Sequence, residues 1–282
     1  MKTIRQLVVC SLAILVITTV SESQSLKPEE IIARHLNAIG TKENRMAVST
    51  LMALGLSEFE SRTPVVKGGG KAVIVSDPGN LFFVMSFNSK EYPFEKIGYF
   101  DGKLSLPFTT AGGRSLLATF IAEHEKMLSD GLIGGLLSLR WPLLDIEKRK
   151  PKINGGGTKK VNDRKAYVLE YAPSGGGSKE FTIKLYFDAE TFNHIRSEYR
   201  YEVESKDGTF GQQNRRASGF ISLTEDFSDF RVVEGLMLPH YQRLDYMTNG
   251  NSGTYQNIWG VKVSEYRVNQ PLQSDFFTFD AK

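Results

Sequence analysis

The chain has 282 residues, with 35 Lys and Arg against 32 Asp and Glu, and one cysteine. Its formal net charge of +3 is too small to give the electrostatic footprint of a nucleic-acid-binding protein. The cysteine, Cys10, lies in an N-terminal apolar segment. Because the rest of the chain has no cysteine, it cannot contain a disulfide, a thiol nucleophile or cysteine-ligated zinc. Its stability must then come from a hydrophobic core.

Residues 1–23 are predicted to be a signal peptide. Lys2 and Arg5 precede an apolar stretch over residues 7–20, which is shorter than the roughly 20 residues of a membrane-spanning helix. A small-x-small cleavage site follows it, and an uncleaved anchor is the alternative. We expect export to the periplasm or cell envelope, with residues 24–282 forming a single domain.

The first predicted element after this segment is a helix over residues 28–40. Pro28 suits the first helical turn, the acidic residues after it favour the positive end of the helix dipole, and Gly40 favours a stop. Apolar residues recur at spacings of three and four, so one face should be buried. Because His35 lies on that face, we expect a buried, hydrogen-bonded histidine and not a ligand.

Strand-like segments fill most of the remaining chain. They are rich in β-branched and aromatic residues and alternate with turn signals such as Asp101-Gly102, Asn249-Gly250 and three glycine triplets, all interpreted as hairpin loops. The run Leu81–Met85 is apolar throughout, which predicts that both of its faces are covered. The predicted strands lie near 46–60, 71–76, 80–87, 94–100, 103–108, 166–171, 181–187, 194–201, 217–227, 236–247 and 253–266.

These segments predict a mainly β fold. Sequential hairpins form most naturally within one antiparallel sheet. A sheet of about 10–11 strands must curl, and we expect an unclosed β-barrel with helices covering its concave face. The chain carries 18 Phe, 11 Tyr and 2 Trp, which either line an apolar cavity in that face or simply fill the core.

One insertion, residues 114–144, interrupts the strands. Its first part is an amphipathic helix over 114–128, and its second part is apolar and rich in glycine from Gly131 to Leu137. Two interpretations remain open at this point. The insertion is either ordinary core or a lid over a cavity, since long insertions are often functional.

Searches for catalytic chemistry find no site. Neither Gly-x-Ser-x-Gly nor His-Glu-x-x-His occurs, and the four histidines, at positions 35, 124, 194 and 240, have no metal-ligand spacing. Neighbouring carboxylates such as Asp226 and Asp229 are best explained as exposed charge. We therefore expect no enzyme activity, no metal and no cofactor.

Short phrases and the order of elements resemble a known family. These are Ile-Ile-Ala-Arg-His-Leu-Asn-Ala-Ile-Gly (31–40), Leu-Tyr-Phe-Asp-Ala-Glu-Thr-Phe (185–192) and Val-Glu-Gly-Leu-Met-Leu-Pro-His (233–240). Together with the signal peptide they resemble the outer-membrane lipoprotein-sorting (LolA/LolB-like) proteins of the bacterial periplasm. The resemblance implies an unclosed barrel of about eleven strands whose helical lid covers a site for acyl chains.

Three functional hypotheses follow. The first is a non-catalytic periplasmic carrier of a lipid or lipoprotein acyl chain, in only transient contact with the membrane. The second is an envelope module that binds protein partners, and a core without a cavity would favour it. The third is a hydrolase, which a pocket holding His124 or His240 beside an acid would favour. Under the first hypothesis, the predicted ligand-binding residues are Leu117, Phe120, Ile121, Leu136, Leu137 and Trp141.

Overall fold

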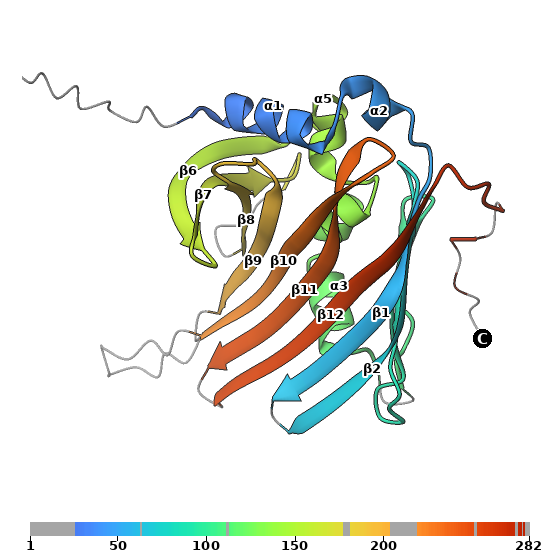
Figure 1. The fold of residues 1–282 in the computed structure, drawn as a ribbon. Helices are drawn as coiled ribbons and strands as arrows, with labels where there is room; N and C mark the ends of the chain where they lie inside the picture. Colours follow the sequence, from blue (N-terminus) through green and yellow to red (C-terminus); the bar gives the residue numbers. More distant parts are fainter. Residues whose placement is uncertain are drawn as a thin grey trace, which may run out of the picture.

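Twelve antiparallel strands form one sheet in the computed structural model (Figure 1). The structure describes residues 26–62, 64–110, 113–176, 181–203, 219–250, 253–273, 276–277 and 279. The predicted signal peptide, residues 1–23, lies outside these residues. Across the sheet the order is β5-β4-β3-β2-β1-β12-β11-β10-β9-β8-β7-β6, so the sheet has two edges and is not closed. The predicted fold class, an unclosed antiparallel sheet with few helices, is confirmed.

The strands follow one another as an up-and-down meander. Only the pair of β1 and β12 joins segments that are distant in sequence. The strands are β1 (Leu51–Arg62), β2 (Val65–Ser76), β3 (Leu81–Ser86), β4 (Phe94–Phe100), β5 (Lys103–Ser105), β6 (Lys152–Val161), β7 (Arg164–Ala172), β8 (Phe181–Asp188), β9 (His194–Val203), β10 (Gly219–Val233), β11 (Leu236–Gly250) and β12 (Gly253–Val268).

The strand missing from the sequence prediction is β6. Its Gly155–Gly157 run and its lysines give no apolar alternation, yet it pairs with β7 across a bulge between Gly155 and Thr158. The interpretation of Gly68–Gly70 as a hairpin loop is also wrong, because this triplet pairs with β1 inside β2. A Cβ atom on Gly70 would lie 2.3 Å from the backbone oxygen of Ser86. Glycine here allows strands to approach closely, and this use of glycine has the same sequence signal as a turn.

The Asp101-Gly102 hairpin is confirmed. Both residues have positive φ, 49° and 75°, as a tight two-residue turn requires, and Phe100 pairs with Lys103 across it. At the second predicted hairpin, β11 runs to Gly250, which pairs with Gly253. Asn249-Gly250 is therefore the end of a strand, and residues 251–252 of the connection lie outside the described part of the chain.

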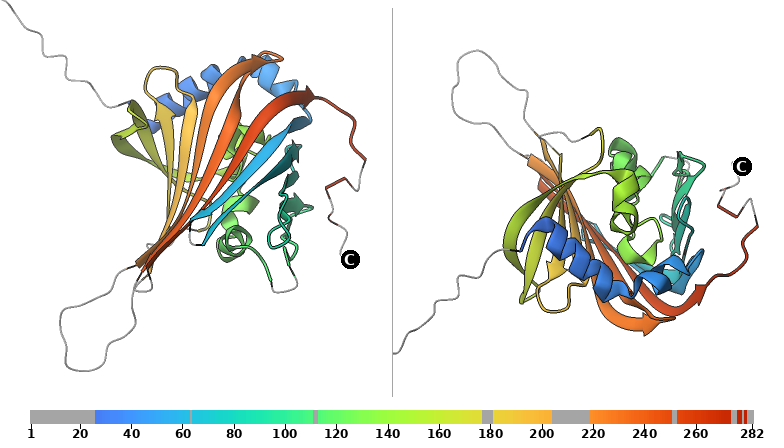
Figure 2. Two further views of the ribbon diagram at one scale, coloured as in Figure 1. Left: turned by 60° about the horizontal axis from the view of Figure 1, so that its bottom comes forward. Right: turned by 90° about the horizontal axis from the view of Figure 1, so that it is seen from above.

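The helix predicted over residues 28–40 is confirmed as α1 (Pro28–Ile39). It buries Ile31, Ile32 and His35 and lies across one end of the sheet together with α2 (Lys42–Met46), as Figure 2 shows. Residues 46–50 were expected to begin the first strand, but Met46 ends α2 and is 74% exposed. Among the described helices, none has the length and apolar character needed to cross a membrane.

The insertion breaks into short helical pieces. It contains α3 (Leu116–Glu123), α4 (Lys126–Ser129), η1 (Gly135–Leu137) and the start of η2 (Pro142–Asp145), and α5 (Ile146–Arg149) follows it. The single helix predicted over 114–128 ends at His124, whose φ of −121° and ψ of 46° leave the helical region. Ser115 begins α3, because its hydroxyl accepts a hydrogen bond from the backbone N–H of Ala118 at 2.9 Å.

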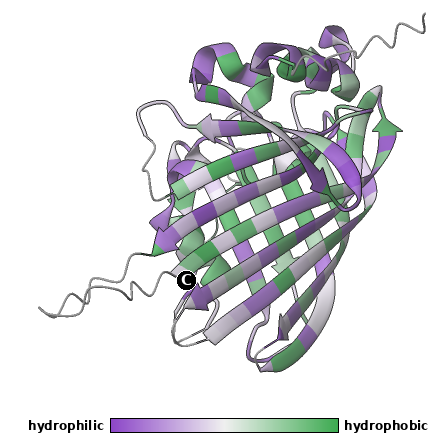
Figure 3. Cartoon of the chain, turned by 90° about the vertical axis from the view of Figure 1, so that its left-hand side faces the viewer, coloured by the Kyte–Doolittle hydropathy of each residue, from purple (hydrophilic) through white to green (hydrophobic). Residues whose placement is uncertain are grey.

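The concave face of the sheet and the insertion share one hydrophobic core. Along the strands apolar and polar residues alternate, which Figure 3 shows as stripes. β3 has the pattern clearly, with Leu81, Phe83 and Met85 fully buried against the core. The insertion packs its apolar side chains onto this face, so helices cover the concave side of the sheet as predicted.

Candidate ligand-binding groove

The six residues predicted to bind a ligand all lie in the insertion and all belong to the hydrophobic core. Leu117, Ile121, Leu137 and Trp141 have no exposed surface, and Phe120 and Leu136 are 1% and 4% exposed. The structure therefore brings them together between the insertion and the sheet. None of them lines the hollow that lies next to them.

That hollow is an open groove, here called the Phe181 groove, with a volume of about 620 Å³. It lies between the α3–α4 junction and the ends of β6, β7 and β8. This volume is within the range of about 300–1,000 Å³ that is typical of small-molecule sites. The groove is lined by residues 123–127, Lys152, Asn154, residues 170–173, Gly176 and residues 181–184.

Aromatic stacking forms the apolar wall of the groove. The ring of His124 is parallel to that of Phe181, with centroids 4.2 Å apart, and it also contacts the rings of Phe120, 4.7 Å away, and Tyr201, 5.5 Å away. Burial lowers the pKa of His124, although Glu123 opposes that change. Since Phe120 is in direct ring contact with His124, one of the sequence-predicted residues forms the layer immediately behind the wall of the groove.

The charged side chains of the groove balance. Lys126, Lys152 and Lys184 face three carboxylates, those of residues 123, 125 and 170, within the same lining. The ammonium group of Lys126 donates a hydrogen bond to the backbone oxygen of Gly175 at 2.9 Å, which links α4 to the β7–β8 connection. His124 lines the groove between Glu123 and Glu125, and among the described residues no hydrogen bond joins it to a carboxylate.

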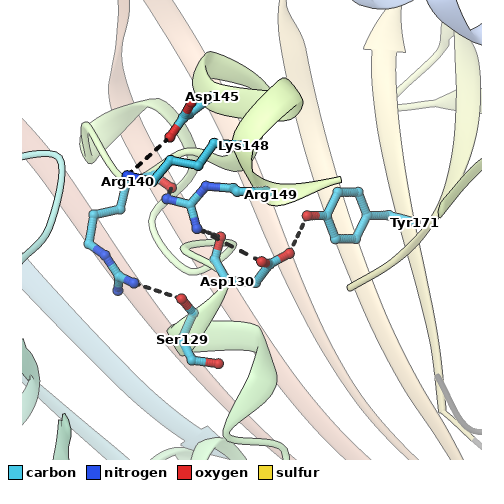
Figure 4. Close-up of polar contacts among 7 residues, drawn as sticks. All are labelled: Ser129, Asp130, Arg140, Asp145, Lys148, Arg149 and Tyr171. Carbon is cyan, nitrogen blue, oxygen red and sulfur yellow. Dashed lines mark hydrogen bonds and ion pairs between the residues drawn. The ribbon is translucent and has the colours of Figure 1, made fainter. Parts of the chain in front are cut away.

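A polar network anchors the insertion beside the groove (Figure 4). Tyr171, which lines the groove, donates a hydrogen bond to the carboxylate of Asp130. Arg149 donates to the backbone oxygens of Asp130 at 2.8 Å and Arg140 at 3.1 Å. The guanidinium of Arg140 donates to the backbone oxygen of Ser129 at 2.7 Å. Burial and the neighbouring Asp130 raise the pKa of Tyr171, which therefore remains a hydrogen-bond donor.

A second anchor is a buried carboxyl group on the concave face. Glu225 of β10 accepts hydrogen bonds from the backbone N–H of Gly134 at 2.9 Å, from Gln242 at 2.7 Å and from the hydroxyl of Tyr199 at 2.8 Å. Burial raises the pKa of Glu225 to about 7. This group ties the glycine-rich part of the insertion to β9, β10 and β11.

Trp141 fixes the last part of the insertion to α1. Its indole N–H donates to Nε2 of His35 at 3.1 Å, and Nδ1 of His35 lies 2.9 Å from the backbone oxygen of Phe192. The histidine is therefore neutral, with its proton on Nδ1, and burial lowers its pKa to about 4. The prediction of a buried, hydrogen-bonded His35 is confirmed.

The Phe181 groove itself was not predicted from the sequence. Phe181, Ile183 and Tyr171 were assigned to strands, and Met127 to the apolar helix face, but nothing in their spacing indicated that they meet. A candidate metal site is also not found, because the described residues hold no group of three or more His, Cys, Asp or Glu that could bind an ion.

No protein-family model matches the chain, and no curated protein sequence matches it. Solved structures are similar to it over most of its length. A LolA superfamily protein from Nitrosomonas europaea is 12% identical, with 91% of this chain and 99% of that chain covered and a TM-score of 0.47. A DUF1329 family protein from Desulfovibrio piger is 14% identical, with coverage of 90% and 98% and a TM-score of 0.41.

A third similar structure, a domain named for outer membrane lipoprotein sorting from Vibrio parahaemolyticus, is 11% identical. It covers 88% of this chain and 96% of its own, with a TM-score of 0.42. The resemblance indicated by the sequence is confirmed as a similarity to solved structures of that group.

Proposed function

We propose that this protein is a non-catalytic binding protein for a lipid or acyl chain in the bacterial cell envelope, and that the Phe181 groove receives the apolar chain. The observation that carries the proposal is the groove itself, which has an aromatic and aliphatic wall and opens at the junction of the insertion and the sheet. Burial of a ligand chain against this wall would provide affinity at about 25 cal/mol per Å² of apolar surface.

The six sequence-predicted residues have a place in this proposal. Phe120 stands directly behind His124, and the other five continue the apolar layer beneath the insertion. A long ligand chain would extend from the groove toward this layer if α3 moved outward. Because the lysines and carboxylates of the groove balance, chain length should determine affinity more than the charge of the headgroup.

Replacing Phe181 by Ser tests the groove. We expect the affinity for a fluorescent fatty acid to fall roughly tenfold or more, because burying a Phe side chain contributes about 1.5–3 kcal/mol. The matched control is Phe220→Ser, since Phe220 is also half-buried in a strand but does not line the groove. Equal loss in both variants, or no loss in Phe181→Ser, would contradict the assignment of the groove.

A second candidate function is an envelope module that binds protein partners. The filled concave face favours it, since Leu117, Leu137 and Trp141 occupy the space where a ligand cavity was expected. Co-purification distinguishes the two candidates. A protein partner without lipid would favour the module, and lipid without a partner would favour the carrier.

A further inference from the structure

The outer side of β3 and β4 carries an aromatic surface that is separate from the groove. Phe82 faces away from the core, because it alternates with the buried Leu81 and Phe83. Directly opposite Phe82 in the next strand is Gly98, and Phe100 follows on the same face. Here this surface, formed by Phe82, Lys96, Gly98 and Phe100, is called the outer β3–β4 face.

The end of the chain covers this face with three phenylalanines. The ring centroid of Phe82 lies 5.4 Å from that of Phe276 and 4.9 Å from that of Phe279. Phe277 is 4% exposed and is parallel to Phe100, with centroids 6.5 Å apart. Aromatic pairs at these separations are attractive beyond their buried area. Both faces of the Leu81–Met85 run were predicted to be covered, and on its outer side this segment covers Phe82.

Gly98 has no side chain, and the ring of Phe279 occupies the space that a side chain would fill. A Cβ atom at this position would lie 2.5 Å from Cε2 of Phe279, so a larger residue here would displace the ring. Glycine weakens the interior of a strand, and its usual reason there is the close approach of another group. The ammonium group of Lys96 lies 5.7 Å from the centroid of the same ring, within range of a cation–π interaction.

Between β12 and these phenylalanines, the described residues 269–273 belong to no helix or strand. Asn269 and Gln270 are held by hydrogen bonds to the segment between α2 and β1, and no described residue after Val268 belongs to a strand. A hollow of about 430 Å³ remains beside this connection, lined in part by Phe100, Leu272 and Phe277. The contacts that Phe276, Phe277 and Phe279 make with this face among the described residues are contacts of their aromatic rings.

We propose that the outer β3–β4 face is a binding site for a peptide with the spacing Phe-Phe-x-Phe, and that Phe276, Phe277 and Phe279 of this chain are its resident ligand. The site would bind three aromatic rings, at the positions of Phe276, Phe277 and Phe279, and the last of these rings would pack on Gly98. A peptide of the same sequence would bind this face from another molecule when the resident segment is removed. This proposal does not depend on the function of the Phe181 groove.

The test uses the full chain with Phe276→Ser, Phe277→Ser and Phe279→Ser combined. A fluorescein-labelled peptide of residues 270–282 should bind this variant saturably, as measured by fluorescence anisotropy. The unaltered chain should bind the peptide at least tenfold more weakly, because its own segment competes at a high effective concentration. Adding Gly98→Val to the combined variant should also weaken binding at least tenfold.

Gly250→Val in the combined variant is the matched control, since a Cβ atom on Gly250 meets nothing within 4 Å, and it should leave binding unchanged. No binding to a combined variant with native circular dichroism would overturn the proposal, as would equal binding with Gly98→Val. If the combined variant does not fold, the single variant Gly98→Val of the full chain tests the proposal instead. Chymotrypsin should then remove the C-terminal segment at least tenfold faster than in the unaltered chain, and an equal rate would overturn the proposal.

Discussion

Trp141→Ala should lower the free energy of unfolding by about 3–5 kcal/mol, the usual cost of removing a fully buried large aromatic side chain. Trp141 has no exposed surface, and its ring stacks on His194 with centroids 4.3 Å apart. The substitution also leaves Nε2 of His35 without its donor. Chemical denaturation followed by circular dichroism measures the effect.

Trp141→Phe separates packing from hydrogen bonding. It keeps most of the ring volume but removes the indole N–H, so it should cost only about 1–2 kcal/mol. Tyr255→Ala is the surface control, because Tyr255 is 44% exposed, and it should change stability by less than about 0.5 kcal/mol. A loss below about 1 kcal/mol in Trp141→Ala would show that the insertion is not fixed to the sheet through this residue.

The second large effect is on the pH dependence of stability. Burial raises the pKa values of Glu225 and Glu95 to about 7, whereas burial lowers the pKa of His35 to about 4 and that of His194 well below 6.5. The carboxyl contributions are fully present below pH 4.5 and are lost as the pH rises through about 7. The histidine contributions are present above pH 6.5 and are lost as the pH falls. Near pH 5.5 the two trends oppose each other.

Glu225→Gln should remove one of the two buried carboxyl groups whose effect on stability opposes that of the histidines near pH 5.5. The amide imitates the protonated carboxyl in its contacts with Gly134 and Gln242, so the fold should be kept. Around pH 5.5 the variant's free energy of unfolding should then rise with pH more steeply than that of the unaltered chain, by about 1.4 kcal/mol per pH unit.

Denaturation curves at intervals between pH 5 and 6.5 measure this slope. The exposed Glu170→Gln serves as the control and should leave the slope unchanged. If Glu225→Gln and the unaltered chain have parallel profiles, Glu225 is already ionised in the folded protein and the buried anchor is wrongly described.

Local patterns predicted the elements well where one signal dominates. The α1 helix follows from its proline start, its apolar stripe and its glycine stop, and the β4–β5 hairpin follows from Asp101-Gly102. The glycine runs gave wrong predictions at Gly68–Gly70 and in β6, where strands were interpreted as loops. Close approach between strands and tight turns favour the same residue. Both uses look alike without knowledge of the neighbouring strand.

The site was predictable only in part. The insertion was recognised as the apolar segment that covers the sheet, and six of its residues do lie together. The Phe181 groove depends on β6, β7 and β8 meeting the end of α3, which is a contact between segments that are distant in sequence and follows from the coiling of the sheet. Nor does any local pattern place Phe279 on Gly98, because their contact is set by the path of the chain after β12.

The most direct test of the proposed function is native mass spectrometry of the mature protein purified from its own cells, followed by lipid extraction. The carrier proposal predicts a bound lipid or fatty acid of restricted chain length that is lost in Phe181→Ser and kept in Phe220→Ser. A lipid-free protein that also fails to bind fluorescent fatty acids would contradict the proposal and favour the protein-binding module.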